Sequence, residues 1–202
     1  MKLACHLHCQ LPRLKGYMYW RSLYHPAPII RVLFISVFEP NMSTPIQTLY
    51  TKCPLGWLRI AGDEAAVHAI AFEEEEGLDS PDPPATLLQC REELNEYFQG
   101  KRKAFTIPWV AEGTPFQQSV WKALAGIPFG HTLSYGHLAR QLGNEDAVRA
   151  VGMANGQNPL AILLPCHRVI GANGKLTGYA GGLWRKKWLL EHEQIGAQGS
   201  LF

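Results

Sequence analysis

Residues 158–171 read NPLAILLPCHRVIG, an apolar run followed by three reactive side chains in succession. The run ends at a proline, and Cys166, His167 and Arg168 come directly after it. A thiol in this position is predicted to be partly buried at the floor of a pocket. A base and a nearby positive charge raise the fraction of cysteine that is thiolate, the nucleophilic form. Cys166 is therefore a candidate nucleophile, and the alternative is a small buried side chain with charged neighbours by chance.

The composition is typical of a globular protein. The chain has 202 residues, of which 47% are hydrophobic and 18% charged, enough for one large domain or two small ones. Five cysteines without regular spacing do not form a disulfide framework, which favours the reducing cytoplasm. The longest apolar run, residues 29–38, is interrupted by Arg31 and is too short to cross a bilayer, so no membrane partner is expected.

The net charge of +2 conceals an asymmetry along the chain. Residues 43–113 carry six Lys or Arg and twelve Asp or Glu, whereas residues 114–202 carry eight and four. A basic C-terminal half suits a polyanion such as nucleic acid, although a solvated surface without a partner could carry the same charge.

Residues 1–41 mix histidine, cysteine, proline and aromatic residues without periodicity. They show neither the apolar segment near the start nor the small-residue cleavage site of a signal peptide. We interpret them as an irregular extension of doubtful native standing, such as an upstream start codon would add. The cluster CHLHC at residues 5–9 has metal-ligating side chains, but its spacing is not that of a recognised zinc site.

Residues 42–113 are predicted to form a small α/β domain. Alternation of apolar and polar residues over 46–72 predicts strands. An acidic and proline-rich loop follows, and then a helix over about 85–98 that Gly100 ends. The segment 100–113 is expected to connect this domain to the second half.

Residues 114–202 are predicted to form a second, mostly helical domain. Thr114 can cap a helix whose first residue is Pro115, and Gln117 completes a capping box. The apolar face of this helix is expected to comprise three residues at helical spacing, Phe116, Val120 and Leu124.

Two short helices are predicted next. Ser134 caps a helix over 135–142 that Gly143 ends, and Asn144 begins another that runs to about residue 155. Two short helices joined by a tight turn with a glycine are typical of a helix-turn-helix, although many helical hairpins look the same.

The stretch 158–171 resembles the active-site signature of the O6-alkylguanine-DNA alkyltransferases, the methylated-DNA–protein-cysteine methyltransferase family. The resemblance extends at consistent spacing through the C-terminal half, and more loosely through the strand-rich part from about residue 46. The segments that carry it in the C-terminal half are TPF at 114–116, SY at 134–135, RAVG at 149–152, GYAGG at 178–182 and WLLEHE at 188–193.

This resemblance implies an α/β (α+β) fold in two domains. A small, strand-rich, ribonuclease-H-like domain over 42–113 would be followed by a mostly helical, winged-helix-like domain over 114–202 with a helix-turn-helix. A monomer is expected, with double-stranded DNA that contains O6-alkylguanine as its partner.

The family's reaction implies a role for three side chains. The Cys166 thiolate would attack the alkyl carbon on guanine O6, and also on thymine O4, and keep the alkyl group as a thioether. Each molecule would therefore act once. His167 would act through a water as base for the thiol, and Glu193 would orient the imidazole. Without the resemblance, Glu193 would be interpreted as a solvated carboxylate at a helix end.

The resemblance also implies how a base reaches the thiol. Guanine O6 is hidden in a duplex, so the nucleotide must be flipped out, and Arg149 would fill the vacated space from the minor groove. Tyr135 would donate to guanine N3 or help rotate the phosphate, and Asn158 would brace the turn of the active-site loop. The remaining substrate contacts are assigned to the backbone carbonyls of Cys166 and Val169, to Tyr179, and to the backbone amide of Ala180.

No cofactor and no metal are expected. Some members of the family bind zinc in the N-terminal domain, and His68 could match one ligand. Asp63, however, stands where a cysteine ligand would be expected. Position 180 is alanine where some relatives have serine, which predicts a roomier pocket with activity retained.

Two other functions are compatible with parts of the sequence. A damage sensor could use the alkylated cysteine as a signal, but such regulators carry additional N-terminal modules for which residues 1–41 are too short. A Cys-His hydrolase lacks a clear oxyanion-hole motif here and leaves Arg149 without a role.

Overall fold

A three-stranded antiparallel sheet begins the computed structural model, which describes residues 45–194. Its strands are β1 (Gln47–Cys53), β2 (Gly56–Gly62) and β3 (Val67–Glu73), in the order β1-β2-β3. β1 and β2 are joined by a tight turn in which Gly56 has φ +112°, a conformation that favours glycine. Residues 1–41, with the cluster at 5–9, lie outside the described residues, so the interpretations given for them stay predictions.

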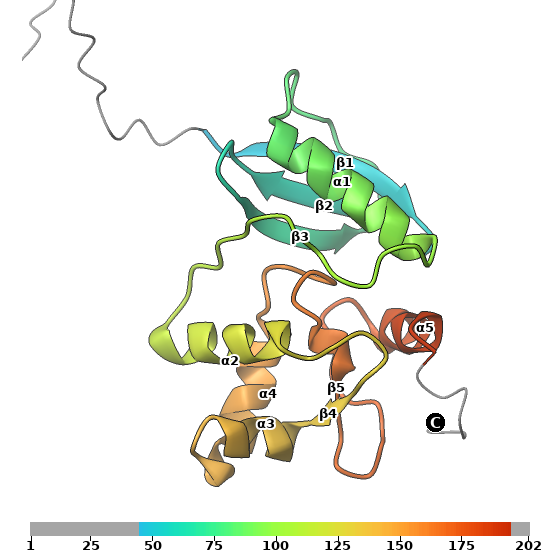
Figure 1. The fold of residues 1–202 in the computed structure, drawn as a ribbon. Helices are drawn as coiled ribbons and strands as arrows, with labels where there is room; N and C mark the ends of the chain where they lie inside the picture. Colours follow the sequence, from blue (N-terminus) through green and yellow to red (C-terminus); the bar gives the residue numbers. More distant parts are fainter. Residues whose placement is uncertain (1–44, 195–202) are drawn as a thin grey trace, which may run out of the picture. The chain divides into compact units, whose positions relative to one another are not determined.

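Helix α1 (Ala85–Phe98) packs across one face of this sheet (Figure 1). Its bounds confirm the helix predicted over 85–98. Leu87 and Leu94 of the helix and Ile60 of β2 are completely buried in the same core. The apolar alternation of the strands is thus explained by one covered face.

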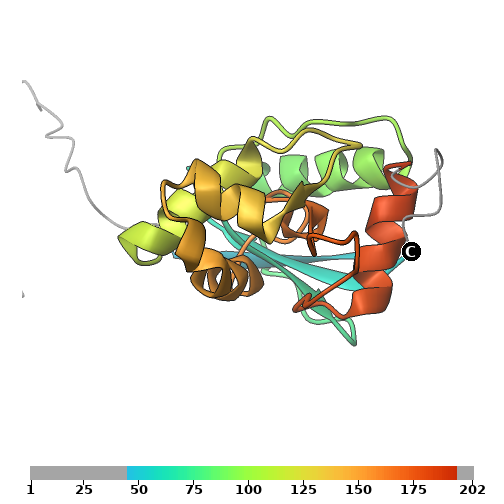
Figure 2. The same ribbon diagram turned by 90° about the horizontal axis from the view of Figure 1, so that it is seen from below.

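The remainder of the described chain is mostly helical. In Figure 2, α3 and α4 lie together, away from α5. The elements in chain order are α2 (Pro115–Ala125), β4 (Leu133–Ser134), α3 (Tyr135–Gln141), the 3₁₀ helix η1 (Glu145–Ala147), α4 (Val148–Gly156), the 3₁₀ helix η2 (Cys166–Arg168), β5 (Val169–Ile170) and α5 (Leu183–His192).

Helix α2 starts as predicted but its apolar face is different. The Thr114 and Gln117 side chains form the reciprocal capping box. Phe116 is 37% exposed, so its predicted place on one apolar face with Val120 and Leu124 was wrong. The buried face of α2 comprises Val120, Trp121 and Leu124, and Phe116 lies about 140° around the helix from Trp121 at about 100° per residue. Trp121 is buried instead, and its indole N–H donates to the Ala154 carbonyl at 2.8 Å.

The helix-turn-helix is present, with a different start to its second helix. Ser134 caps α3 through the amide of His137, as predicted. Asn144 instead caps the 3₁₀ helix η1, by accepting from the amide of Asp146, and the α-helix begins only at Val148. Gly143, with φ +77°, makes the turn that brings α3 and α4 together.

Two short pairings place the segment around residue 166. The amide of Ile70 in β3 donates to the Pro159 carbonyl at 2.8 Å, and the amide of Ala161 donates back to Ile70 at 3.0 Å. β4 and β5 pair in parallel, with Leu133 opposite Val169. The edge of the sheet and the start of α3 thus hold the two ends of the loop that carries Cys166. No helix among residues 45–194 is long and apolar enough to cross a membrane.

Candidate active site

Cys166 is the first residue of η2 and lines a cavity of about 390 Å³. The residue is 6% exposed, in agreement with the predicted partly buried thiol. The walls come from β3, from the end of α4 and from the loop over 178–182. A nucleophile at this place can be reached only by a group that enters the cavity.

The loop before Cys166 is held by side-chain bonds and by a strained backbone. The Asn158 amide nitrogen donates to the Leu164 carbonyl at 2.7 Å, and its oxygen accepts from the amide of Leu160 at 3.0 Å. Ile162 is buried with φ +71°, a conformation rare for a β-branched residue. Such strain persists only where the surroundings fix the backbone, and it fixes the approach of the chain to Cys166.

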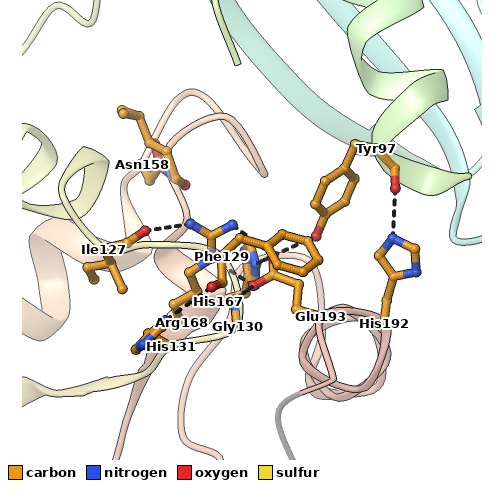
Figure 3. Close-up of polar contacts among 11 residues, drawn as sticks. Tyr97, Ile127, Phe129, Gly130, His131, Asn158, His167, Arg168, His192 and Glu193 are labelled. Atoms are coloured by element: carbon orange, nitrogen blue, oxygen red, sulfur yellow. Dashed lines mark hydrogen bonds and ion pairs between the residues drawn. The ribbon is translucent and has the colours of Figure 1, made fainter. Parts of the chain in front are cut away.

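His167 and Arg168, the two residues that follow Cys166 in the chain, form a buried cluster with Glu193 (Figure 3). The His167 Nε2 atom lies 2.9 Å from Glu193 Oε1. Arg168 donates to both oxygens of the same carboxylate, through Nε at 2.8 Å and Nη2 at 2.9 Å. Its third nitrogen donates to the Ile127 carbonyl at 2.6 Å. The bidentate geometry fixes the carboxylate toward the imidazole.

The ionisation of this cluster follows from its burial and hydrogen bonds. Burial alone would raise the pKa of Glu193, but hydrogen bonds from His167 and Arg168 lower it to about 2. Burial lowers the pKa of His167 against the opposing effect of Glu193. The imidazole is therefore neutral at neutral pH, and Nε2–H donates to Glu193. Nδ1 is then the acceptor nitrogen, and within residues 45–194 it has no hydrogen-bond partner.

The positive charge that acts on the thiol is not the one that the sequence suggested. Arg168 was expected to act on Cys166 as a neighbouring cation, but its guanidinium is committed to Glu193 and the Ile127 carbonyl. Burial raises the pKa of the Cys166 thiol, and a bond from Asn158 and the charge of Lys186 offset this only in part. The thiol therefore remains protonated at neutral pH, and its reaction needs a base.

Lys186 of α5 is a site residue that the sequence analysis missed. Its side chain is completely buried, and Nζ donates to the Val169 carbonyl at 2.7 Å and the Thr177 carbonyl at 2.8 Å. The spacing of 186, 189, 190 and 193 places these positions on one helical face. That face contains Leu189 and Leu190, a signal that could have revealed both the buried lysine and the buried Glu193.

A second hollow, of about 430 Å³, adjoins the Cys166 cavity and shares Gly156, Tyr179 and Ala180 with it. The structure brings Tyr135 and Arg149 to the same hollow, and Arg149 is exposed. The Tyr135 hydroxyl donates to the Thr177 carbonyl at 3.4 Å.

The two carbonyls assigned to substrate binding already accept protein donors. The Val169 carbonyl accepts from Lys186, and the Cys166 carbonyl accepts from the Asn155 amide nitrogen at 3.4 Å. The amide of Val169 also donates to the Cys166 carbonyl, so both lone pairs of that oxygen are engaged, whereas the Val169 carbonyl retains one acceptor position.

Two family models match the chain, one after the other. Residues 46–109 match the 6-O-methylguanine DNA methyltransferase, ribonuclease-like domain, and residues 115–195 match the DNA binding domain of the same methyltransferase. The chain belongs to the 6-O-methylguanine DNA methyltransferase family. The resemblance carried by residues 158–171 is thereby confirmed, as is the mixed α/β fold with an N-terminal sheet and a helical C-terminal part.

The similar proteins cover most of the described chain. The methylated-DNA–protein-cysteine methyltransferase of Shigella flexneri is 57% identical over 169 residues, which are 79% of this chain and 96% of that protein. The protein of that name from Mycobacterium tuberculosis H37Rv is 48% identical over 153 residues, 73% of this chain and 92% of its own.

Solved structures of the same family are also similar. The crystal structure of Mycobacterium tuberculosis O6-methylguanine methyltransferase has a TM-score of 0.68 at 44% identity, covering 74% of this chain and 93% of that one. The structure of the Mycobacterium tuberculosis protein in complex with DNA has a TM-score of 0.66 at 44% identity, covering 78% and 98%.

The C-terminal half of this methyltransferase carries less positive charge on its surface than its sequence suggests. Arg168, Arg185 and Lys186 are buried and serve the interior. The exposed charges between residues 114 and 194 are five basic residues (Lys122, Arg140, Arg149, Lys175 and Lys187) and three acidic ones (Glu145, Asp146 and Glu191). A contact with DNA phosphates here must rely on few side chains and on backbone amides.

His68 and Asp63, the two positions considered for a zinc site, contact each other. His68 Nε2 lies 3.1 Å from Asp63 Oδ2. Over the part of the chain that the structure describes, no three His, Cys, Asp or Glu side chains group together as a metal site would need. The absence of a metal from this methyltransferase stays a prediction.

Proposed function

We propose that the protein repairs DNA by transferring a methyl or larger alkyl group from O6 of guanine to its own Cys166, once and irreversibly. The same transfer is proposed from O4 of thymine. The observation that carries this proposal is the Cys166 thiol at the floor of a cavity, beside a buried imidazole–carboxylate pair. The names of the similar proteins from Shigella flexneri and Mycobacterium tuberculosis describe this activity, and the latter has been crystallised with DNA.

The transfer is an in-line displacement at the alkyl carbon. The sulfur lone pair forms the new C–S bond as the C–O6 bond breaks, and the electron pair of that bond stays on the guanine. The thiol proton passes through a water to Nδ1 of His167, and Glu193 stabilises the resulting imidazolium. The product thioether has no good leaving group, so the protein is consumed.

The leaving guanine is stabilised by hydrogen bonds. The backbone amide of Ala180 donates to O6, and the Tyr135 hydroxyl donates to N3 or helps to rotate the phosphate. The remaining lone pair of the Val169 carbonyl accepts from the exocyclic amine, and the Cys166 carbonyl does so in place of its long bond from Asn155. Donors placed where negative charge develops lower the barrier, because a bare oxyanion is a poor leaving group.

The substrate enters as a flipped nucleotide from the minor groove of a duplex. Arg149 on α4 fills the space that the base leaves, while Tyr179 lines the mouth of the Cys166 cavity. Asn158 braces the loop that carries the thiol. The meeting of these side chains at two adjoining hollows supports this path.

The wider organisation is proposed on the same basis. A domain over 42–113 and a domain over 114–202 act together as a monomer without cofactor or metal, and residues 1–41 are not needed. Because a free thiol must be kept reduced until it reacts, we place the protein in the cytoplasm.

The decisive experiment measures mass after reaction with a duplex that contains O6-methylguanine. Each molecule is expected to gain one methyl group, located on the peptide with Cys166. Cys53→Ala, which changes a half-buried thiol outside the site, should gain the same mass, and Cys166→Ala should gain none. Repeated turnover, or transfer that survives Cys166→Ala, would falsify the mechanism.

A further inference from the structure

Tyr97 is the residue by which α1 of the ribonuclease-like domain reaches the active site. Its side chain is completely buried, and its hydroxyl donates to Glu193 Oε1 at 2.8 Å, across 96 positions of the chain (Figure 3). A buried hydroxyl in aromatic surroundings is costly unless it has a partner, and a phenylalanine would fill the same space. The hydroxyl therefore calls for a role beyond packing.

The hydroxyl shares its acceptor atom with the imidazole. Oε1 of Glu193 accepts from Tyr97, from His167 Nε2 at 2.9 Å and from Arg168 Nη2 at 2.9 Å. Oε2 accepts from Arg168 Nε and, at 3.3 Å, from the amide of Gly130. A donor on Oε1 disperses the negative charge that attracts the imidazole proton. Removing that donor leaves more charge facing His167.

Contacts to the backbone carbonyl and to the aromatic ring fix the position of Tyr97. His192 Nε2 lies 2.7 Å from the Tyr97 carbonyl oxygen, and the His192 ring stacks on Trp188 at 4.9 Å between centroids. The Tyr97 ring packs edge-on against Phe98 and Phe129, with centroids 5.4 and 6.2 Å away. Burial and the adjacent carboxylate raise the pKa of Tyr97 far above its usual range, so the hydroxyl keeps its proton and remains a donor.

The other charged groups that face His167 and Glu193 cannot replace this donor. The Arg168 nitrogens are bound to Glu193 and to the Ile127 carbonyl. Lys186 acts on His167 through its charge, but Nζ is bound to two backbone carbonyls. Cys166 is a neutral thiol at rest because burial raises its pKa.

We infer that Tyr97 is a positioning residue, through which the ribonuclease-like domain sets the orientation and charge of the carboxylate that serves His167. The inference rests on the proposed function, since it takes His167 as the base of the transfer. It gives the first domain a part in the chemistry that its distance from Cys166 along the chain does not suggest.

The test compares Tyr97→Phe with Tyr50→Phe, the same change on β1 of the same domain. The second-order rate of methyl transfer from a duplex is measured between about pH 5 and 9. Tyr97→Phe is expected to lower the rate about tenfold near pH 7 and to move the midpoint of the acid limb upward by about half a unit to one unit. The midpoint of the acid limb should move upward because more negative charge on Glu193 Oε1 favours the imidazolium form of His167. Tyr50→Phe should match the unchanged protein.

A second measurement separates the inference from the proposed function. Nitrogen NMR of His167 records its titration without any reaction, and the same upward shift is expected there. If the unchanged protein gained no methyl group, the proposed function would fail, whereas the NMR comparison would still decide the role of Tyr97.

A second substitution keeps the hydroxyl and therefore the fold. Tyrosine fluorinated next to its hydroxyl is a stronger donor, so at position 97 it should move the His167 midpoint downward. Two results would show that Tyr97 only packs. One is a loss of rate in Tyr97→Phe that is equal at every pH, with an unchanged midpoint. The other is the same His167 midpoint in the unchanged protein, in Tyr97→Phe and in the protein with fluorinated Tyr97.

Discussion

In the described part of the chain, some of the buried charged side chains near Cys166 have a partner of opposite charge and one does not. Glu193 and Arg168 form a bidentate pair, and His167 is neutral and hydrogen-bonded to Glu193. Lys186 is left as a buried cation without a carboxylate partner among the described residues: its Nζ donates to two backbone carbonyls and lies 5.8 Å from the centroid of the Tyr135 ring. Burial lowers its pKa to about 8, and the charge of a Cys166 thiolate would raise it. Lys186 therefore favours the ionised form of the nucleophile as it appears during the reaction.

The buried histidine makes folding sensitive to mild acid. Burial keeps the pKa of His167 below its ordinary value, so below about pH 6.5 the unfolded chain binds a proton that the native state does not. The free energy of unfolding should therefore fall between about pH 7 and 5, by up to about 2 kcal/mol from this residue. Urea denaturation at each pH measures this.

A matched pair of variants assigns the effect. His167→Gln should lose this part of the pH dependence, while His137→Gln, at an exposed position, should retain it. An equal slope in both variants would contradict the assignment. Glu193 acts in a lower window, because its contribution is complete above about pH 4.5 and is lost only as the pH falls through about 2.

Among the elements, those with local signals could be predicted from the sequence. The bounds of α1, the capping box of α2 and the cap of α3 depend on residues within one turn of each other. Phe116 was assigned to the wrong face because the helix is rotated so that Trp121 packs inward. The 3₁₀ helix before α4 was not predicted, since a cap such as Asn144 can begin either type of helix.

The candidate site was predictable only where its parts are adjacent in the chain. Cys166, His167 and Arg168 stand together, but the partner of Arg168 was not apparent. Glu193 entered through the family resemblance alone, since a carboxylate at a helix end is usually solvated. Tyr97 gave no local signal of its role, because its hydroxyl binds a residue 96 positions away. The apolar face of α5 indicated that Lys186 is buried, but not which carbonyls it binds.

Arg149 tests the role of α4 as the element that opens the duplex. Arg149→Ala should lower the rate with a methylated duplex by at least about tenfold and leave the rate with free O6-methylguanine within about twofold. Arg140→Ala removes an exposed arginine from the neighbouring helix and should affect the duplex rate much less. Equal losses on duplex and free base would mean that Arg149 does not support the flipped state.

At the scale of the whole molecule, one arginine joins the sheet to the substrate loop. The Arg185 guanidinium lies over the rings of Phe72, at 4.9 Å, and Trp184, at 4.6 Å. Its Nε donates to the Leu55 carbonyl and its Nη1 to the Gly181 carbonyl, both at 3.0 Å. A side chain at Gly181 would press on the Phe72 ring at 2.9 Å, so the loop lies directly against β3.

Arg185→Lys is expected to loosen this connection. Lysine cannot make both bonds or stack between two rings, so we expect a loss of about 1–3 kcal/mol in the free energy of unfolding. The transfer rate should fall with both duplex and free base, unlike that of Arg149→Ala, because the loop with Ala180 is displaced. Lys187→Arg, at an exposed neighbouring position, is the control, and an unchanged free-base rate in Arg185→Lys would refute the connection.

The place of Glu193 has a consequence for how the protein is made. A chain emerges from the ribosome from its N-terminus, and domains fold as they appear. Tyr97 is therefore exposed to the cell first and His167 next, whereas Glu193 follows His167 by 26 positions. Until α5 docks, the imidazole has no carboxylate and Arg168 no counter-ion. The thiol of the nascent chain therefore lacks its complete imidazole–carboxylate pair until α5 and the residue that follows it, Glu193, have been made and have docked.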